Sequence, residues 1–132
     1  MSAQPAILVV DDNRDAREII VLFLKGVGFH AIEASTGPQA ISAAQAAHPA
    51  LILLDLSLPE IFGDEVTARL KADPTTQDIP IVIVTALPPE EAVVKRAVER
   101  GAEEIVMKPY SLKHLGEVIR RYAHQPHAST AT

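Results

Sequence analysis

The chain of 132 residues carries a formal net charge of −5, contains 48% hydrophobic and 22% charged residues, and has no cysteine. This length and composition suit one globular domain that buries roughly two thirds of the surface exposed by its unfolded chain. The acidic balance argues against non-specific nucleic-acid binding, and the lack of cysteine excludes disulfides, thiolate metal sites and cysteine nucleophiles. No basic-then-apolar leader and no bilayer-length apolar run are present, so we expect a cytoplasmic protein.

Short runs rich in valine, isoleucine and leucine alternate with longer stretches whose apolar residues recur at helical spacing. The strand-like runs lie near 6–10, 30–34, 50–54, 79–84 and 104–107. The helical stretches are one ending at Gly26–Gly28, then about 37–47, about 64–72, 88–100 and about 111–123. The alternation predicts an α/β fold, with a parallel sheet covered by helices on both faces.

Several helix boundaries have recognisable signals. Pro88 and Pro89 predict the start of the fourth helix, with Glu90 and Glu91 in its first turn, and Ser111 is a candidate N-cap of the fifth. Residues 124–132 lack periodicity and apolar content. We therefore expect one domain over 1–123 and a flexible tail over 124–132.

Polar side chains follow four of the strand-like runs. In an open parallel sheet, ligands bind in the crevice beyond the carboxyl ends of the strands, so these side chains should converge on one site. Taken alone, each favours a plainer interpretation, since an aspartate after a strand is usually a turn former or a helix cap. The combination of carboxylates, a hydroxyl and an amine favours a site. The residues are Asp11, Asp12, Asp55, Thr85 and Lys108.

The residue types suit phosphoryl transfer. Asp55 is the candidate nucleophile, because aspartate forms acyl-phosphate intermediates and is ionised at neutral pH. Asp11 and Asp12, with Asp55, offer carboxylate oxygens to Mg²⁺, which would neutralise charge near an anionic phosphoryl donor. Without a cation, two such charges about 4 Å apart repel by roughly 4 kcal/mol at a surface-like dielectric. Lys108 and Thr85 can contact phosphoryl oxygens.

These motifs resemble those of the receiver domain of two-component response regulators, of the single-domain chemotaxis type. The resemblance covers about 6–123 and implies a flavodoxin-like (βα)5 fold, doubly wound, with strand order 2-1-3-4-5. The motifs that carry it are Val10-Asp11-Asp12, Asp55 with Leu58-Pro59 and Gly63, Thr85-Ala86, and Lys108-Pro109-Tyr110.

The resemblance also implies a function. Asp55 would be phosphorylated by a histidine kinase or a histidine phosphotransfer protein and would then lose the phosphate by self-dephosphorylation. Mg²⁺ would be bound by Asp12, Asp55 and the backbone carbonyl of Ser57, with Asp11 acting through water. Thr85, Ala86 and Lys108 would surround the phosphoryl group, and a cis Lys108–Pro109 bond would aim the lysine. These roles are those of a signalling switch that is not an enzyme.

Three positions modulate the pattern. Ile105 stands where many receivers have an aromatic residue that swings inward, so we expect a smaller shift centred on Thr85. Ser57 and Leu87 occupy positions that tune hydrolysis of the acyl phosphate. Leu87 should hinder water, which predicts a long-lived phosphoryl state.

The resemblance implies two partner surfaces. The phosphodonor would dock on the first helix, at Arg14, Ala16, Arg17 and Ile20. The face formed by the fourth helix, fifth strand and fifth helix would bind an unidentified protein target, or a second copy in a weak, phosphorylation-dependent dimer. Otherwise we expect a monomer that binds neither nucleic acid nor membrane. Charges for symmetric pairs on that face would be Lys95, Arg96, Glu99, Glu104 and Arg120.

Two alternatives remain. A haloacid-dehalogenase-type phosphotransferase also uses an aspartate nucleophile and Mg²⁺, but it requires a second aspartate two residues further on, where this chain has Ser57. A pseudo-receiver would bind partners without phosphate turnover. It should lack at least one site residue, and all five are present.

Overall fold

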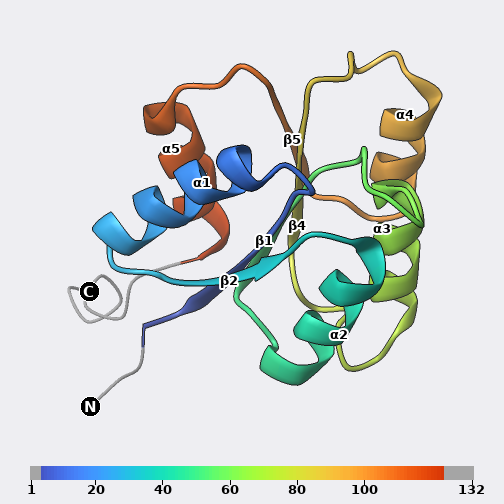
Figure 1. Ribbon diagram of the computed structural model, residues 1–132. Coiled ribbons are helices and arrows are strands. Elements are labelled where there is room, and N and C mark those ends of the chain that lie inside the picture. The colour runs from blue at the N-terminus through green and yellow to red at the C-terminus, as the bar shows by residue number, and fades with distance from the viewer. Residues whose placement is uncertain (1–3, 124–132) are drawn as a thin grey trace.

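Five strands form one parallel sheet in the computed structural model, which describes residues 4–123. The spatial order is β2-β1-β3-β4-β5, and every neighbouring pair is parallel (Figure 1). The predicted α/β class and strand order are therefore confirmed. The strands are β1 (Ala6–Val10), β2 (His30–Ala34), β3 (Leu51–Leu54), β4 (Ile81–Thr85) and β5 (Glu104–Met107).

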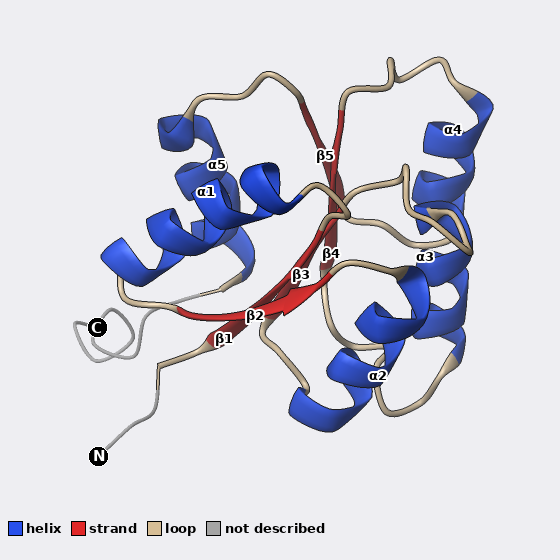
Figure 2. Ribbon diagram, viewed as in Figure 1, coloured by secondary structure: helices blue, strands red, loops and turns tan. Residues whose placement is uncertain are grey.

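Five helices cover both faces of this sheet. α1 and α5 lie on one face, and α2, α3 and α4 lie on the other (Figure 2). Every connection between strands contains one helix, which brings the chain back to start the next parallel strand. The helices are α1 (Arg14–Gly26), α2 (Gly37–Ala47), α3 (Gly63–Ala72), α4 (Ala92–Glu99) and α5 (Leu112–Tyr122).

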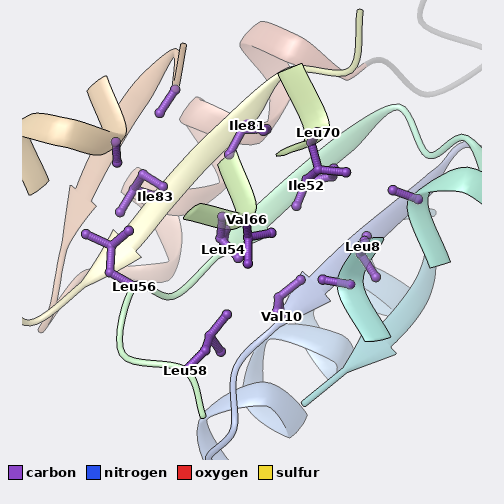
Figure 3. Close-up of a cluster of buried hydrophobic side chains, with 14 of the residues drawn as sticks. Leu8, Val10, Ile52, Leu54, Leu56, Leu58, Val66, Leu70, Ile81 and Ile83 are labelled. Atoms are coloured by element: carbon purple, nitrogen blue, oxygen red, sulfur yellow. The ribbon is translucent and has the colours of Figure 1, made fainter. Parts of the chain in front are cut away.

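The sheet separates two apolar cores. β3 is buried along its whole length, since alternate side chains point to opposite faces and both faces are covered. In the larger core, strand residues pack against α2, α3 and α4, whose alanines Ala40, Ala44 and Ala97 allow close approach. Figure 3 shows part of this core, with Leu8, Val10, Ile52, Leu54, Leu56, Leu58, Val66, Leu70, Ile81 and Ile83 labelled.

Side-chain caps fix three helix starts. The Asn13 side chain accepts a hydrogen bond from the Ala16 N–H (2.8 Å), and Thr36 caps α2 in the same way. The Ser111 hydroxyl accepts from the His114 N–H (3.0 Å), which confirms the predicted cap of α5. Asn13, directly after Asp12, thus acts as the N-cap of α1.

The predicted start of the fourth helix is wrong. Pro88 and Glu91 close a turn through the Glu91 N–H and the Pro88 carbonyl (3.0 Å), and α4 begins only at Ala92. Glu90 therefore precedes the helix, and Glu91 occupies its N-cap position without a side-chain cap. Pro89 is the second residue of this turn, a position that favours the fixed φ of proline as a helix start does, so the signal was ambiguous.

The expected tail over 124–132 lies outside the described residues. Within 4–123, no helix combines the length and the apolar character needed to span a bilayer.

A buried carboxylate joins α3 to α4. The Asp64 side chain, 8% exposed, accepts hydrogen bonds from Arg96 Nε (2.9 Å) and Arg100 Nη1 (3.2 Å). Asp64 also lies in the first turn of α3, where the helix dipole favours negative charge. The neighbouring Glu65 is 45% exposed and pairs with Arg69 (3.2 Å) and Arg100 (3.5 Å) at the surface. We therefore expect Asp64 to carry most of the polar stabilisation between these helices.

Replacing Asp64 with alanine should lower the free energy of unfolding by about 2 kcal/mol, because two charge-assisted hydrogen bonds are lost. Glu65→Ala is the matched control in the same helical turn and should cost about 0.5 kcal/mol or less, as exposed pairs do. Urea unfolding of both variants measures the difference. Equal losses would show that Asp64 contributes no more than a surface pair.

Candidate functional site

The carboxyl ends of four strands bring the predicted polar residues together. Asp11 follows β1, Asp55 follows β3, Thr85 is the last residue of β4, and Lys108 follows β5. The ladder continues past the strand ends, since the Asp55 N–H donates to the Val10 carbonyl (3.0 Å) and the Lys108 N–H to the Thr85 carbonyl (2.8 Å). The backbone at the site is thus held by the sheet itself.

Three carboxylates form an acidic cluster at this edge. Asp11, Asp12 and Asp55 each present an oxygen within 4.8 Å of the others. Asp11 and Asp55 are buried, at 3% and 8% exposure, whereas Asp12 is exposed. Local hydrogen bonds orient the buried pair, since Asp11 Oδ1 accepts from the Asn13 N–H (2.9 Å) and Asp55 Oδ1 from the Ser57 N–H (3.2 Å). Such a set of hard oxygen donors can bind a divalent cation such as Mg²⁺.

Lys108 supplies positive charge to the cluster. Its Nζ lies 3.0 Å from Asp11 Oδ2 and 3.5 Å from Asp55 Oδ2. The following Lys108–Pro109 peptide bond is cis. Through these two contacts Lys108, which follows the edge strand β5, bridges carboxylates that follow β1 and β3.

The surroundings shift the pKa of both Asp55 and Lys108. Burial raises the pKa of Asp55, and the charge of Asp11 raises it further, against the opposing effects of Lys108 and the Ser57 N–H. Burial alone would lower the pKa of Lys108, but its hydrogen bond to Asp11 and the charge of Asp55 outweigh this and leave the pKa raised. The ionised Asp55 is thus disfavoured by its surroundings, while the protonated lysine is stabilised.

Thr85, the last residue of β4, is bonded to the loop that leads to α4. The side chain is fully buried, and its Oγ1 accepts a hydrogen bond from the Leu87 N–H (3.1 Å). The hydroxyl hydrogen can still donate to another acceptor. The next residue, Ala86, is exposed.

A groove of ≈ 240 Å³ opens beside the acidic cluster. Leu87 lines it together with Leu56, Ser57, Phe62 and Val93. Phe62 is 60% exposed. Its aromatic wall next to Ser57 was not singled out from the sequence, because no spacing places residue 62 near residue 87.

Gly63 is required where the chain passes over Asp55. A Cβ at this position would lie 2.8 Å from the Asp55 carbonyl oxygen and 2.8 Å from Leu56 Cα. Both are backbone atoms and cannot give way by a rotamer change. The Gly63 N–H also donates to the Leu56 carbonyl (2.9 Å), which fixes the β3–α3 loop beside the candidate nucleophile.

The expected phosphodonor surface needs correction at Ile20. Ile20 is 3% exposed and packs in the core with Val21 and Leu24, whereas Ile19 and Leu22 are the exposed apolar residues of α1. The reason is helical phase, since residues 20 and 24 lie on the same face toward the sheet. On the face formed by α4, β5 and α5, Arg96 pairs with Asp64 within the chain, and Glu104 pairs with Arg121 and Tyr122.

The remaining modulator also has a defined place. Ile105 is partly buried and packs, like Leu87 and Val93, against the larger core. The aliphatic side chain of Ile105 therefore occupies the position at which many receivers have an aromatic ring that swings inward.

Residues 7–120 match the family model of the response regulator receiver domain. This chain belongs to that family. Receiver domains are signalling switches and in general are not classed as enzymes. The match covers all five strand–helix units apart from the ends of the first strand and the last helix.

Known proteins of similar sequence and structure agree with this assignment. The phosphate regulon transcriptional regulatory protein PhoB of Pseudomonas aeruginosa is 39% identical over 109 residues, which are 83% of this chain and 47% of that protein. This receiver spans about half the length of the curated relatives it matches.

Two solved structures share the receiver fold. One is the receiver domain of sensor histidine kinase PA1611 from Pseudomonas aeruginosa, with a magnesium ion coordinated in its active-site cleft. It is 25% identical, has a TM-score of 0.84, and the match covers 91% of this chain and 98% of that chain. The other is the phosphorylated cyanobacterial phytochrome response regulator RcpA, with 27% identity, a TM-score of 0.77, and 94% and 99% coverage.

The shifted pKa of Asp55 predicts the effect of removing its charge. Without divalent cations at pH 7, the Asp55→Asn receiver should melt about 3 °C higher than the wild type, because the fold disfavours this carboxylate when it is ionised. The folded-state pKa is raised, so wild-type stability falls as the pH rises from the ordinary value near 4 through the folded value. The advantage of the variant should therefore disappear as the pH is lowered toward 4.

Thermal unfolding in the presence of a chelator, at several pH values, measures this difference. Asp15→Asn, which removes an exposed carboxylate from the first turn of α1, is the control and should give no gain. An Asp55→Asn melting point at or below that of the wild type at pH 7 would contradict the charge argument.

Proposed function

We propose that this receiver is a phosphorylation-dependent switch in which Asp55 accepts a phosphoryl group from a histidine kinase or a histidine phosphotransfer protein. The observation that carries the proposal is the placement of the Asp55 carboxylate. It ends a fully buried strand, lies within 4.8 Å of Asp11 and Asp12 oxygens, and has the Lys108 ammonium 3.5 Å away. The candidate nucleophile thus lies next to two carboxylates that could share a divalent cation with it, and next to the positively charged side chain of Lys108.

The acidic cluster fits Mg²⁺ by its donor chemistry, because three carboxylates that repel one another offer hard oxygen ligands. Asp12 and Asp55 would hold the ion directly, Asp11 through water, and the Ser57 carbonyl would complete the protein ligands. When bound, Mg²⁺ would neutralise charge on the donor and on the cluster. The Mg²⁺ in the active-site cleft of the PA1611 receiver supports this assignment.

In the proposed reaction, an Asp55 carboxylate oxygen forms a bond to phosphorus while the phosphorus–nitrogen bond of the donor histidine breaks. Lys108, whose pKa is raised before the reaction, exchanges its contact with Asp55 for one with a phosphoryl oxygen. The Thr85 hydroxyl donates to another phosphoryl oxygen while its own oxygen still accepts from Leu87. Transfer onto Asp55 and hydrolysis from it are the only chemical steps.

The output of the switch is a change in affinity for a protein target. The net charge of −5 supports a protein rather than a nucleic acid as the partner. Thr85 is linked to the surface in two steps. Its oxygen accepts a hydrogen bond from the Leu87 N–H, and the Leu87 side chain lines a surface groove together with Val93 of α4. We propose this path in place of an aromatic swing, because position 105 is isoleucine.

Incubation with Mg²⁺ and acetyl phosphate should give a phosphate adduct in intact-mass spectra that decays when the donor is removed. Asp55→Asn should form none, and Lys108→Ala should form less, because it loses the charge beside the attacking oxygen. Absence of an adduct in the folded wild type would favour a partner-binding pseudo-receiver. Rapid turnover of the donor without an adduct would favour a phosphotransferase.

Truncation of Leu87 should shorten the lifetime of the adduct several-fold, because its side chain lines the groove next to Ser57 and restricts the approach of water. The measurement is the decay of adduct mass after donor removal in Leu87→Ala. Ile41→Ala is the control, since Ile41 also packs partly buried against the larger core but lies on α2, outside this groove. Equal lifetimes in wild type and Leu87→Ala would refute the shielding role.

A further inference from the structure

Arg17 has an unusual environment for an arginine on an outer helix. Its side chain is only 15% exposed, whereas that of Arg14, one turn earlier, is 83% exposed. The guanidinium donates from Nη1 to the backbone carbonyl of Asp11 (2.7 Å) and from Nε to Glu33 Oε1 on β2 (2.8 Å). Arg17 therefore links α1, the end of β1 and β2 at one point.

The contact with Asp11 falls on the loop that carries two of the three carboxylates. The Asp11 N–H donates to the Ala34 carbonyl (3.1 Å), and its side chain accepts from the Asn13 N–H (2.9 Å) and Lys108 Nζ (3.0 Å). The hydrogen bond from Arg17 occupies the remaining polar group, the carbonyl. That carbonyl belongs to the peptide that joins Asp11 to Asp12, so the guanidinium fixes the plane from which the exposed Asp12 projects.

We propose that Arg17, held by Glu33, is a positioning residue that orients the Asp11–Asp12 loop for Mg²⁺. The inference rests on the proposed metal site. It assigns no direct contact with the ion, because a cation repels a cation. The geometry requires a guanidinium, because its planar group of donors can bond a carbonyl and a carboxylate at the same time. The compact ammonium group of a lysine does not present donors in this fixed arrangement.

Positioning and simple charge have opposite consequences for metal affinity. If Arg17 acted only through its charge, its removal would make the site more negative and would strengthen Mg²⁺ binding. If it positions the loop, its removal weakens binding in spite of the gain in negative charge. The sign of the change in affinity therefore separates the two roles.

The experiment is calorimetric titration of Mg²⁺ into the unphosphorylated full chain, compared among wild type, Arg17→Met, Arg17→Lys and Arg14→Met. We expect Arg17→Met to raise the dissociation constant about tenfold, the scale seen when residues that orient metal ligands are replaced. Arg17→Lys keeps the charge and should also weaken binding. Arg14→Met removes a nearby charge without a loop contact and should leave the constant unchanged or lower it.

Metal-free melting temperatures of the same variants separate positioning from a general structural role. Lower stability of Arg17→Met with an unchanged dissociation constant would overturn the proposal, and so would tighter binding. If Arg17→Met fails to fold, Arg17→Lys decides, since wild-type affinity in it would also refute positioning. A wild type that binds no Mg²⁺ would instead show that the proposed metal site is wrong, whatever the role of Arg17.

Discussion

Repulsion among three carboxylates is the constraint on which the rest of this structure depends. Asp11, Asp12 and Asp55 hold oxygens within 4.8 Å of one another, and two of the three side chains are buried. At about 4 Å and an effective dielectric near 20, one such pair costs roughly 4 kcal/mol when both members are charged. Lys108 offsets part of this cost by contacting Asp11 and Asp55. The chain thus stores unfavourable charge that a divalent cation or a phosphoryl group can relieve.

The sheet makes this arrangement possible because it leaves the site little freedom to relax. Asp55 follows a strand that is buried on both faces, and its N–H extends the ladder to Val10. Gly63 passes so close to the Asp55 carbonyl that a methyl group would not fit. The cores on the two faces of the sheet therefore act on function directly, since they prevent the carboxylates from moving apart.

Patterns that repeat locally were enough to predict the elements and the members of the acidic cluster. No single residue was enough, but several strand-like runs followed by complementary polar residues favour one site in an α/β chain, because parallel strands end at the same edge. Two predictions from the sequence were wrong. The start of the fourth helix was placed at Pro88, although proline also suits a turn. Ile20 was placed on a partner surface, although its position in the helix turns it toward the sheet. The sequence placed Arg17 on the expected phosphodonor surface but could not reveal the contacts of that side chain with Asp11 and Glu33, since these depend on the packing of a helix over a strand pair.

In the proposed switch, a change at Asp55 has to pass through tightly packed residues of β4 and α4 before it alters the surface. Thr85 is fully buried, so a movement of its side chain disturbs the hydrogen bond that its oxygen accepts from the Leu87 N–H. Leu87 and Val93 line the same groove, and Val93 belongs to α4, which the buried Asp64 ties to α3 through Arg96. A shift of the loop must therefore either displace α4 against this ion pair or be absorbed in the groove.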